Sequence, residues 1–483
     1  MTRTWWPLAG LVLLVLAAAT ITRADADLWG HVRFGLDSLR DRRLTSIDPY
    51  SFTQDVPWLN HEWLSELQMG MAYAIAGSVG LSLLKAALAF LTFAIVWSAL
   101  RGAANGARIA VMVLVTFGTI HMTSSLRPQL WTFVSFALLC RALSDPFSRL
   151  RRWLPVLFAL WANVHGGWVV GLGVLGVWAA IEMLIKPETR RAWFVIAAAS
   201  ALATLCTPYG WKLWEFVART VRVTRDIDEW RSLWGTPVLN WVPWFVAVGG
   251  IMWAAARRSV SLLPVVAVLS MLAYGSARVM RIESLFVCAA AILLAPLVIA
   301  RWPARFVRLP ADRSRYEPVV ALVMFLVPAV ASGVIAARSV GCLPTIGDWA
   351  PDAEPVVVLA QNAGGRLVTY FNWGEYALWH LGPQLRISMD GRRETIYSDR
   401  RIAEHDAIIE GTAAGLETLA KWNPEYVWLP ASSRTTRKWL MQHGYRLALE
   451  SPRSFVAVRA DLATPGPSTP VAGTGTLPGC FPG

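Results

Sequence analysis

Acidic and histidine residues that could move a proton gather soon after the first apolar segment. The stretch Asp25-Ala-Asp27-Leu-Trp-Gly-His31 places two carboxylates and one imidazole close together. A carboxylate at the end of a membrane helix can take a proton from an alcohol, and with a nearby histidine it can hold a divalent cation. The same residues also fit a solvated helix start beside an interfacial tryptophan, Trp29. The stretch therefore predicts either a general base or an ordinary helix cap.

A second histidine and carboxylate pair, His61 and Glu62, precedes an apolar stretch over 64–77. This stretch predicts an interfacial helix that returns the chain to the membrane. Asn60 fits the cap of that helix, so the polar residues before it serve either the helix start or a site.

Further polar residues lie at those ends of the apolar segments that we place at the outer face of a membrane. They are Arg127, Asn163, His165, Arg278 and Arg281. The three arginines are suited to bind a lipid phosphate or diphosphate, and ordinary headgroup binding is the alternative. The other two residues precede Gly166-Gly167, where an irregular backbone would need a cavity or protein partners. His165 could equally be a hydrogen-bonding group between packed helices.

The composition requires a membrane. The 483 residues are 55% hydrophobic and only 16% charged, whereas soluble domains carry about 25% charged residues. This balance excludes an ordinary cytosolic enzyme, and five cysteines exclude a disulfide scaffold. The net charge is +13, which we assign to membrane orientation, and no nucleic-acid partner is expected.

Apolar runs near the length of about 20 residues that crosses a bilayer predict eleven spans. They are 5–22, 79–100, 107–125, 128–143, 153–164, 167–185, 191–207, 238–256, 260–277, 282–300 and 318–337. The loops 101–108, 141–152, 186–191, 257–259 and 301–317 then share one side and carry sixteen Lys and Arg against four Asp and Glu. The excess makes that side cytoplasmic, with the amino terminus inside and the carboxyl terminus outside. The first span could instead be a cleaved signal peptide ending near Ala24-Asp25-Ala26.

These spans predict a mainly α-helical polytopic membrane domain over 1–338, with a first outer loop at 23–78 and an outer segment at 208–237. Within that segment 211–237 reads as an interfacial lid, and its acidic residues Asp226, Asp228 and Glu229 could equally be solvated charge.

Residues 339–461 predict a small extracytoplasmic α/β domain, and 462–483 predict a disordered tail. The expected strands are Val356–Leu359, Arg366–Phe371, Arg386–Met389, Tyr426–Leu429, Arg446–Leu449 and Phe455–Val458, with helices near 373–381, 399–421 and 433–443.

Three residues of this domain follow predicted strands, where α/β sheets commonly bind ligands: Trp373, Asp390 and Arg392. Turn chemistry alone would also produce such residues there. Cys342 and Cys480 flank the domain and could form a disulfide in an oxidising compartment, but the sequence leaves the pairing open.

Several motifs together resemble a bacterial branch of the GT-C superfamily, the polytopic RgtA-like and PMT-like membrane glycosyltransferases. They are Asp25-Ala-Asp27-Leu-Trp-Gly-His31, Asp48-Pro-Tyr-Ser51, Trp58-Leu-Asn-His-Glu62-Trp63-Leu64-Ser65, Arg127-Pro128, Trp161-Ala-Asn163-Val-His165-Gly166-Gly167, Pro208-Tyr-Gly210 and Asp390-Gly391-Arg392. The resemblance implies that Asp27, with Asp25 as the alternative, is the base for an inverting displacement on a polyprenyl-phosphate sugar.

The resemblance also assigns roles to the other candidates. His31, His61 and Glu62 would orient the acceptor or a metal ion, and Arg127, Arg278 and Arg281 would bind the departing lipid phosphate. No cofactor is certain. A divalent cation, Mg²⁺ or Mn²⁺, is the one candidate, with Asp25, Asp27 and His31 as its ligands.

The expected function is transfer of a sugar to an envelope glycan, lipid or protein at the outer face of a bacterial plasma membrane. A flippase for lipid-linked glycans and a non-catalytic envelope scaffold are the alternatives. The polar groups crowd at the outer ends of the spans, which themselves contain few charges such as Lys85 and Glu182. A transporter would place polar groups through the depth of the helical bundle, so the distribution favours an outward-facing site.

Overall fold

The computed structural model describes residues 22–103, 105–145, 148–220, 230–301, 341–345, 349–361, 364–462 and 479–483, with isolated positions 326, 330, 333, 334 and 347. The predicted spans 5–22 and 318–337 lie almost wholly outside these residues, as do Asp226, Asp228, Glu229 and most of the predicted tail.

The chain divides into two compact units. The helical unit comprises Met1–Thr22 and Val79–Gly341, and the sheet unit comprises Arg23–Ser78 and Cys342–Gly483. The sequence prediction grouped 23–78 with the membrane domain, whereas the structure groups this loop with the carboxyl-terminal residues. Backbone bridges explain the difference, because Ala24 pairs with Thr345 and Ser51 pairs with Ile387.

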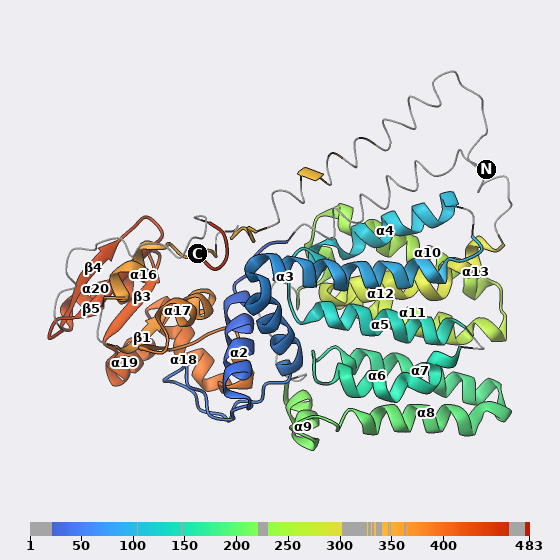
Figure 1. Cartoon of the computed structure of the whole chain (residues 1–483), viewed down its shortest axis with the longest axis horizontal. Helices are drawn as coiled ribbons and strands as arrows, with labels where there is room; N and C mark the ends of the chain where they lie inside the picture. Colours follow the sequence, from blue (N-terminus) through green and yellow to red (C-terminus); the bar gives the residue numbers. More distant parts are fainter. Residues whose placement is uncertain are drawn as a thin grey trace. The chain divides into compact units, whose positions relative to one another are not determined.

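The helical unit is a bundle in which α4, α5, α10, α11 and α12 run side by side (Figure 1). The helices are α3 (Trp63–Ala99), α4 (Asn105–Thr123), α5 (Gln129–Ser144), α6 (Leu154–Trp161), α7 (Trp168–Ile185), α8 (Arg190–Ala203), α9 (Trp211–Thr220), α10 (Trp241–Ala256), α11 (Leu263–Arg278), α12 (Glu283–Ala289) and α13 (Ala295–Ile299). A π-helical turn, Ala290–Leu294, joins α12 to α13. Helix α3 begins in the sheet unit and loses helical geometry at Ala76 and Gly77, the last two residues of the predicted interfacial helix, just before the predicted span 79–100.

Six helical segments in the described part of the chain are long and apolar enough to cross a membrane. They are Trp63–Ala99, Gly106–Thr123, Trp168–Ile185, Val238–Ala256, Val260–Arg278 and Met280–Ile299. Large apolar side chains such as Leu184 and Met252 are 74% and 68% exposed, as expected for surfaces that face lipid. The chain is therefore a mainly helical multi-pass membrane protein. The predicted crossing at 153–164 contains the eight-residue helix α6, which packs against α8.

The sheet unit contains α2 (Leu28–Asp41), the start of α3, and a five-stranded sheet with the order β2-β1-β3-β5-β4. Strand β1 runs parallel to β2 and β3, and β5 runs antiparallel to β3 and β4. The elements are α16 (Glu354–Leu359), β1 (Gly365–Thr369), α17 (Gly374–Leu381), β2 (Leu385–Ile387), α18 (Asp399–Glu410), α19 (Ala413–Trp422), β3 (Tyr426–Pro430), α20 (Arg434–Gln442), β4 (Tyr445–Glu450) and β5 (Ser454–Arg459).

Five of the six predicted strands are confirmed. The strand predicted at Val356–Leu359 is wrong, because this apolar run belongs to α16, where Pro355 occupies the first turn and favours a helix. The helix predicted at 399–421 is two helices. Gly411 ends α18 in the left-handed region at φ 73°, and the Thr412 side chain accepts a hydrogen bond from Gly415 N–H to cap α19.

Apolar residues of the central strands form a buried core cluster in the sheet unit. Val368, Val427, Leu429 and Ala457 pack with residues from the surrounding helices, among them Ile408, Leu419 and Leu440. Cys342 and Cys480 form a disulfide with a Cα–Cα distance of 5.1 Å, which settles the pairing that the sequence left open. Phe481 is 1% exposed, and residues 480–482 are buried, in contrast to the disorder predicted for the whole tail.

Arg392 joins the first loop to the sheet. Its guanidinium group donates to Asp48 Oδ1 at 2.7 Å and to Asp390 Oδ2 at 2.6 Å, and both carboxylates are fully buried. The rings of Phe34, Tyr50 and Trp58 surround it at 4.7, 5.2 and 4.8 Å. Burial alone would lower the pKa of Arg392, but Asp390 and Asp48 raise it well above its usual value. The side chain is therefore permanently charged and fully engaged within the unit.

We expect Arg392→Met to destabilise the sheet unit by about 3–5 kcal/mol, because it leaves two buried carboxylates without their cation. Thermal unfolding of the purified protein measures the effect. Arg400→Met is the matched control, since the Arg400 side chain is 73% exposed and lies 3.9 Å from Glu404. Equal unfolding midpoints for the two variants would contradict a central role for Arg392.

Candidate functional site

Asp27 lies directly before α2 and is half-buried. Its backbone N–H donates to the Asp25 carboxylate at 3.2 Å, so Asp25 supports the turn that precedes the helix. Trp29 is fully buried and its Nε1 donates to the carbonyl oxygen of Pro482 at 2.8 Å. Trp29 thus fixes the first turn of α2 inside the sheet unit. The alternative in which Trp29 lies at a lipid interface is wrong, because the side chain is buried in protein.

Glu375 approaches the same turn from α17. Its Oε2 accepts a hydrogen bond from Gly30 N–H at 3.0 Å, and the side chain is only 3% exposed. A Cβ atom on Gly391 would lie 2.4 Å from Asp27 Oδ1 and 2.8 Å from Glu375 Oε1. Gly391 therefore marks the place where the two carboxyl groups converge.

Burial raises the pKa of Glu375, and the nearby charges of Asp27 and Asp390 raise it further. Arg392 and the N–H group of Gly30 act in the opposite direction, and burial prevails. The sequence pattern predicts a site at Trp373, two residues earlier, but does not include Glu375. The available signal was an acidic residue at the carboxyl end of a parallel strand, the edge at which α/β sheets usually bind ligands.

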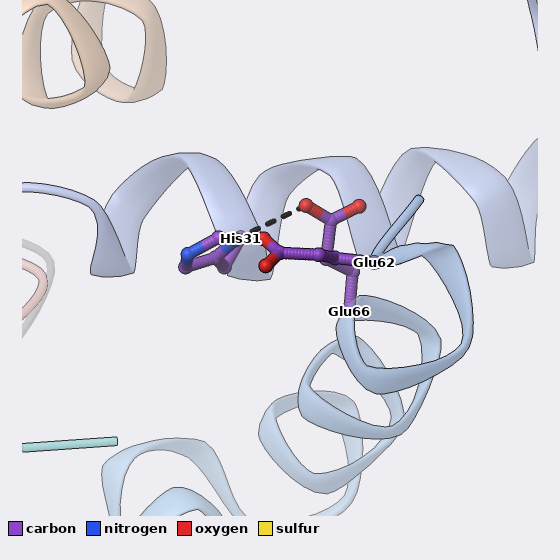
Figure 2. Close-up of side chains that lie close together, drawn as sticks. All are labelled: His31, Glu62 and Glu66. Atoms are coloured by element: carbon purple, nitrogen blue, oxygen red, sulfur yellow. Dashed lines mark hydrogen bonds and ion pairs between the residues drawn. The ribbon is translucent and has the colours of Figure 1, made fainter. Parts of the chain in front are cut away.

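A second cluster of polar side chains includes His31, which lies four residues after Asp27. Figure 2 shows His31 on α2 near Glu62, which directly precedes α3, and Glu66, which lies in the first turn of α3. His31 Nδ1 is 3.0 Å from Glu66 Oε1, and Asn60 Nδ2 donates to Glu66 Oε2 at 2.5 Å. Ligand atoms of His31, Glu62 and Glu66 all lie within 4.8 Å of one another, the one such metal-type group in the described part of the chain.

This cluster differs from the metal ligands that the sequence predicted. His31 is retained, but Glu62 and Glu66 take the places expected for Asp25 and Asp27. His61 lies beside the cluster, with Nε2 at 3.6 Å from Glu62 Oε1. Sequence reasoning missed Glu66, although its spacing of four residues from Glu62 puts both side chains on one face of a helix.

His31 carries a proton in the metal-free protein. Burial lowers its pKa, but the hydrogen bond to Glu66 and the charges of Glu66, Glu62 and Asp27 overcome this and raise it to about 9. His31 is therefore an imidazolium at neutral pH, paired with Glu66. Such a pair ties α2 to the start of α3 within the sheet unit.

The helical unit holds a separate hydrogen-bonded chain. Arg281 Nη2 lies 3.0 Å from His165 Nε2, and His165 Nδ1 lies 2.8 Å from Thr132 Oγ1, which also accepts from Trp161 Nε1 at 2.8 Å. Gly167 N–H also donates to His165 Nδ1, at 3.0 Å. His165 thus links the Arg281 side chain to α5 and to the start of α7.

The remaining predicted residues have different surroundings. Asn163 is 7% exposed and donates to the carbonyl oxygens of Ala159 and Cys206 at 2.7 and 2.9 Å, which links α6 to the end of α8. Arg127 is half-buried before α5, and Arg278 is exposed at the end of α11.

In the sheet unit, Trp373 is 4% exposed and donates through Nε1 to the Trp349 carbonyl oxygen at 2.8 Å. Asp390 is fully buried against Arg392. The three residues predicted at the strand ends are Trp373, Asp390 and Arg392. Their polar groups bond to other groups of the sheet unit, so these residues form part of its interior next to the turn before α2.

We expect His31→Gln to destabilise the metal-free protein by on the order of 2 kcal/mol near pH 6, because it removes the charged partner of Glu66. The pKa of His31 is higher in the folded than in the unfolded chain, so its stabilising effect is complete below about pH 6.5 and is lost as the pH rises through 9. Thermal unfolding in a chelator at pH 6, 8 and 10 measures the difference. His443→Gln is the control, since that histidine is exposed. A difference that does not shrink toward pH 10 would contradict the assignment.

No protein-family model and no curated protein matches the chain. Solved structures do match it over nearly its whole length. ArnT from Cupriavidus metallidurans in the apo state is 12% identical at a TM-score of 0.58, with 96% of this chain and 99% of that chain covered. The same protein bound to undecaprenyl phosphate is 12% identical at 0.57, with 97% and 100% covered.

The oligosaccharyltransferase of Archaeoglobus fulgidus, tethered with an acceptor peptide, is 11% identical at a TM-score of 0.55, with 95% of this chain and 74% of that chain covered. At such identities the likeness is one of fold. Both proteins are GT-C glycosyltransferases. Together with the helical bundle and the carboxyl-terminal sheet, these matches show that the chain has a GT-C-like fold.

Proposed function

We propose that this chain is an integral-membrane glycosyltransferase that transfers a sugar from a polyprenyl-phosphate donor to an envelope glycan, lipid or protein. The observation that carries the proposal is Asp27, a half-buried carboxylate fixed before α2 by buried neighbours in a chain with a GT-C-like fold. Undecaprenyl phosphate is the lipid bound to the similar ArnT structure. The Cys342–Cys480 disulfide supports an oxidising, extracytoplasmic location for the sheet unit.

In the proposed reaction, Asp27 accepts the proton of an acceptor hydroxyl group. The oxygen atom attacks the anomeric carbon, the bond from that carbon to the phosphate oxygen breaks, and the configuration inverts. The lipid phosphate leaves with the bonding electron pair. Among the three predicted phosphate ligands, Arg281 has a guanidinium group that a contact with His165 already orients. Arg127 and Arg278 are assigned to the same phosphate, and Asn163 supports the backbone near His165.

We expect Asp27→Asn to lower the turnover number by about 10²–10⁴-fold, because it removes the general base while preserving the shape of the side chain. The assay uses purified protein in liposomes with a panel of undecaprenyl-phosphate-linked hexoses and pentoses, and follows labelled sugar into membrane-extract acceptors.

Asp25→Asn is the matched control, and we expect it to retain more activity than Asp27→Asn. Turnover that survives Asp27→Asn would remove Asp27 as the base. Movement of the labelled lipid between leaflets without any transfer would favour the flippase.

A divalent cation is part of the proposal. The nitrogen and carboxylate donors of His31, Glu62 and Glu66 fit such an ion by type and by mutual distance. An imidazole ligand favours Mn²⁺ over Mg²⁺, which prefers oxygen ligands. A bound cation would supply positive charge near the acceptor and would fix the start of α3 against α2. His61 would lie beside it, through its contact with Glu62.

We expect the purified protein to bind Mn²⁺, and both His31→Ala and Glu66→Gln to weaken binding by at least about tenfold. Electron paramagnetic resonance of free Mn²⁺ at increasing protein concentration measures the affinity directly. His443→Ala serves as the control because it removes an exposed histidine elsewhere in the sheet unit. Equal affinities for wild type and the His31 variant would rule out this site.

A further inference from the structure

A buried carboxyl group of the helical unit has no task in the proposed reaction. Glu283 begins α12, lies inside the membrane-crossing segment Met280–Ile299, and is only 1% exposed. Neither oxygen atom of its carboxyl group has a hydrogen-bond partner among the residues that the structure describes. A carboxyl group taken out of water without a partner is costly to keep, and an ionisable residue inside a membrane segment usually serves a function.

Other buried polar side chains of this unit show the usual pattern. Ser284, the next residue, donates to the carbonyl oxygen of Gly118 at 2.8 Å. Glu182, a carboxylate of α7 that is 8% exposed, accepts hydrogen bonds from Lys186 Nζ at 3.0 and 3.2 Å. Because buried polar groups in folded proteins are nearly always bonded, a ligand is the natural source of the partner that Glu283 lacks in the described part of the chain.

The backbone of the same segment is also irregular. Residues Ala290–Leu294, directly after α12, form a π-helical turn. Such turns are rare and are frequently found at functional sites. The unpartnered carboxyl group and the irregular turn therefore give two independent indications that the segment from Glu283 to Leu294 does more than pack between neighbouring helices.

We propose that Glu283 binds hydroxyl groups of the donor sugar. The proposal deepens the proposed function and rests on it, because it takes the donor to be a polyprenyl-phosphate sugar. A carboxylate only accepts hydrogen bonds, so its ligand must donate them, and two adjacent hydroxyl groups of a sugar ring can donate to its two oxygen atoms. An ammonium group could donate as well, but Arg278 and Arg281 lie within five residues of Glu283 and oppose a cationic ligand.

The place of Glu283 in the chain agrees with this role. Arg281, a proposed ligand of the lipid phosphate, lies two residues earlier and contacts His165 Nε2 at 3.0 Å. Cα atoms two residues apart are separated by at most about 7 Å, a distance that one sugar phosphate can span. Residues 279–282 are half-buried, whereas every residue of α12 is buried. The donor is therefore expected to reach the carboxyl group from the turn that precedes α12.

The stability of the donor-free protein gives the first test. Glu283→Met should unfold at the same temperature as wild type or at a higher one, because it removes a buried carboxyl group for which the described residues supply no partner. Glu283→Gln keeps the shape of the side chain and serves as the second variant. A lower unfolding temperature for both variants would show that the carboxyl group stabilises the fold, and would overturn a ligand-binding role.

Donor binding gives the second test. The probes are undecaprenyl phosphate and its glucose-, galactose- and mannose-linked forms, added without acceptor to the purified full-length protein, and their affinities are read from the shift in unfolding temperature. Glu283→Met should weaken binding of the preferred sugar-linked lipid by about 10–100-fold and leave the affinity for undecaprenyl phosphate unchanged. Glu182→Met, which removes a buried carboxylate that already has a partner, should change neither affinity.

A deoxy analogue of the preferred lipid identifies the hydroxyl group. The analogue that lacks the recognised hydroxyl group should bind wild type about 10–100-fold more weakly than the parent lipid, and should bind Glu283→Met as tightly as the parent lipid does. Additive losses for every deoxy position would mean that Glu283 does not contact the sugar, and would overturn the proposal.

The outcomes separate this inference from the proposed function. If Asp27→Asn abolishes transfer but Glu283→Met alters only the KM of the acceptor, the proposed function stands and the donor-binding role of Glu283 fails. If wild type binds no sugar-linked lipid more tightly than undecaprenyl phosphate, recognition of the sugar fails while binding of the lipid phosphate stands. If wild type binds neither lipid and transfers no sugar, both are overturned.

Discussion

A guanidinium group buried between two carboxylates holds the sheet unit together. Arg392 bonds to Asp390 two residues away and to Asp48 from the first loop, inside a cage of three aromatic rings. Removing three charges from water is costly, and the cost is offset only while all three groups remain paired. The position of the first loop on the sheet is therefore set by a contact that tolerates little displacement. Because the turn before α2 belongs to the same unit, the position of Asp27 is fixed as well.

Glycine residues allow close backbone contacts around the turn before α2. Gly30, Gly374 and Gly391 lie where α2, α17 and the segment after β2 approach one another, and a Cβ atom at any of them would meet a carboxyl group or a backbone carbonyl. The neighbouring large side chains do the opposite. Trp29, Tyr376 and Phe481 fill the adjacent space with ring centroids 5.2–5.3 Å from Trp29. Close backbone contact on one side and dense aromatic packing on the other leave the carboxyl groups little freedom to reorient.

The sequence predicts the elements well and their partners poorly. Periodicity and length give the membrane helices, and β-branched runs give five strands, because these patterns are local. The run at Val356–Leu359 shows the limit, since an apolar stretch of that length fits a strand or a helix equally until Pro355 is weighed. The motif residues Asp27 and His31 stand out through their spacing. Glu375 and Glu66 do not stand out in the sequence. Glu375 contacts Gly30, which is 345 residues away, and Glu66 contacts His31 on a different helix. For the same reason the sequence predicts a ligand-binding role for Arg392. In the structure its two carboxylate partners are Asp48 and Asp390 of the same chain.

The order of the segments along the chain has a consequence for biosynthesis. Residues 23–78 are made early, yet their partners in the sheet unit, from Thr345 to Pro482, are made only after the whole helical unit. Until then the newly synthesised first loop exposes Trp29 and an uncompensated Asp48, a state in which apolar surface is open to wrong partners. Completion of the candidate active site therefore follows synthesis of the helical unit, and a chain truncated before Pro482 would contain its membrane helices and still lack a finished site.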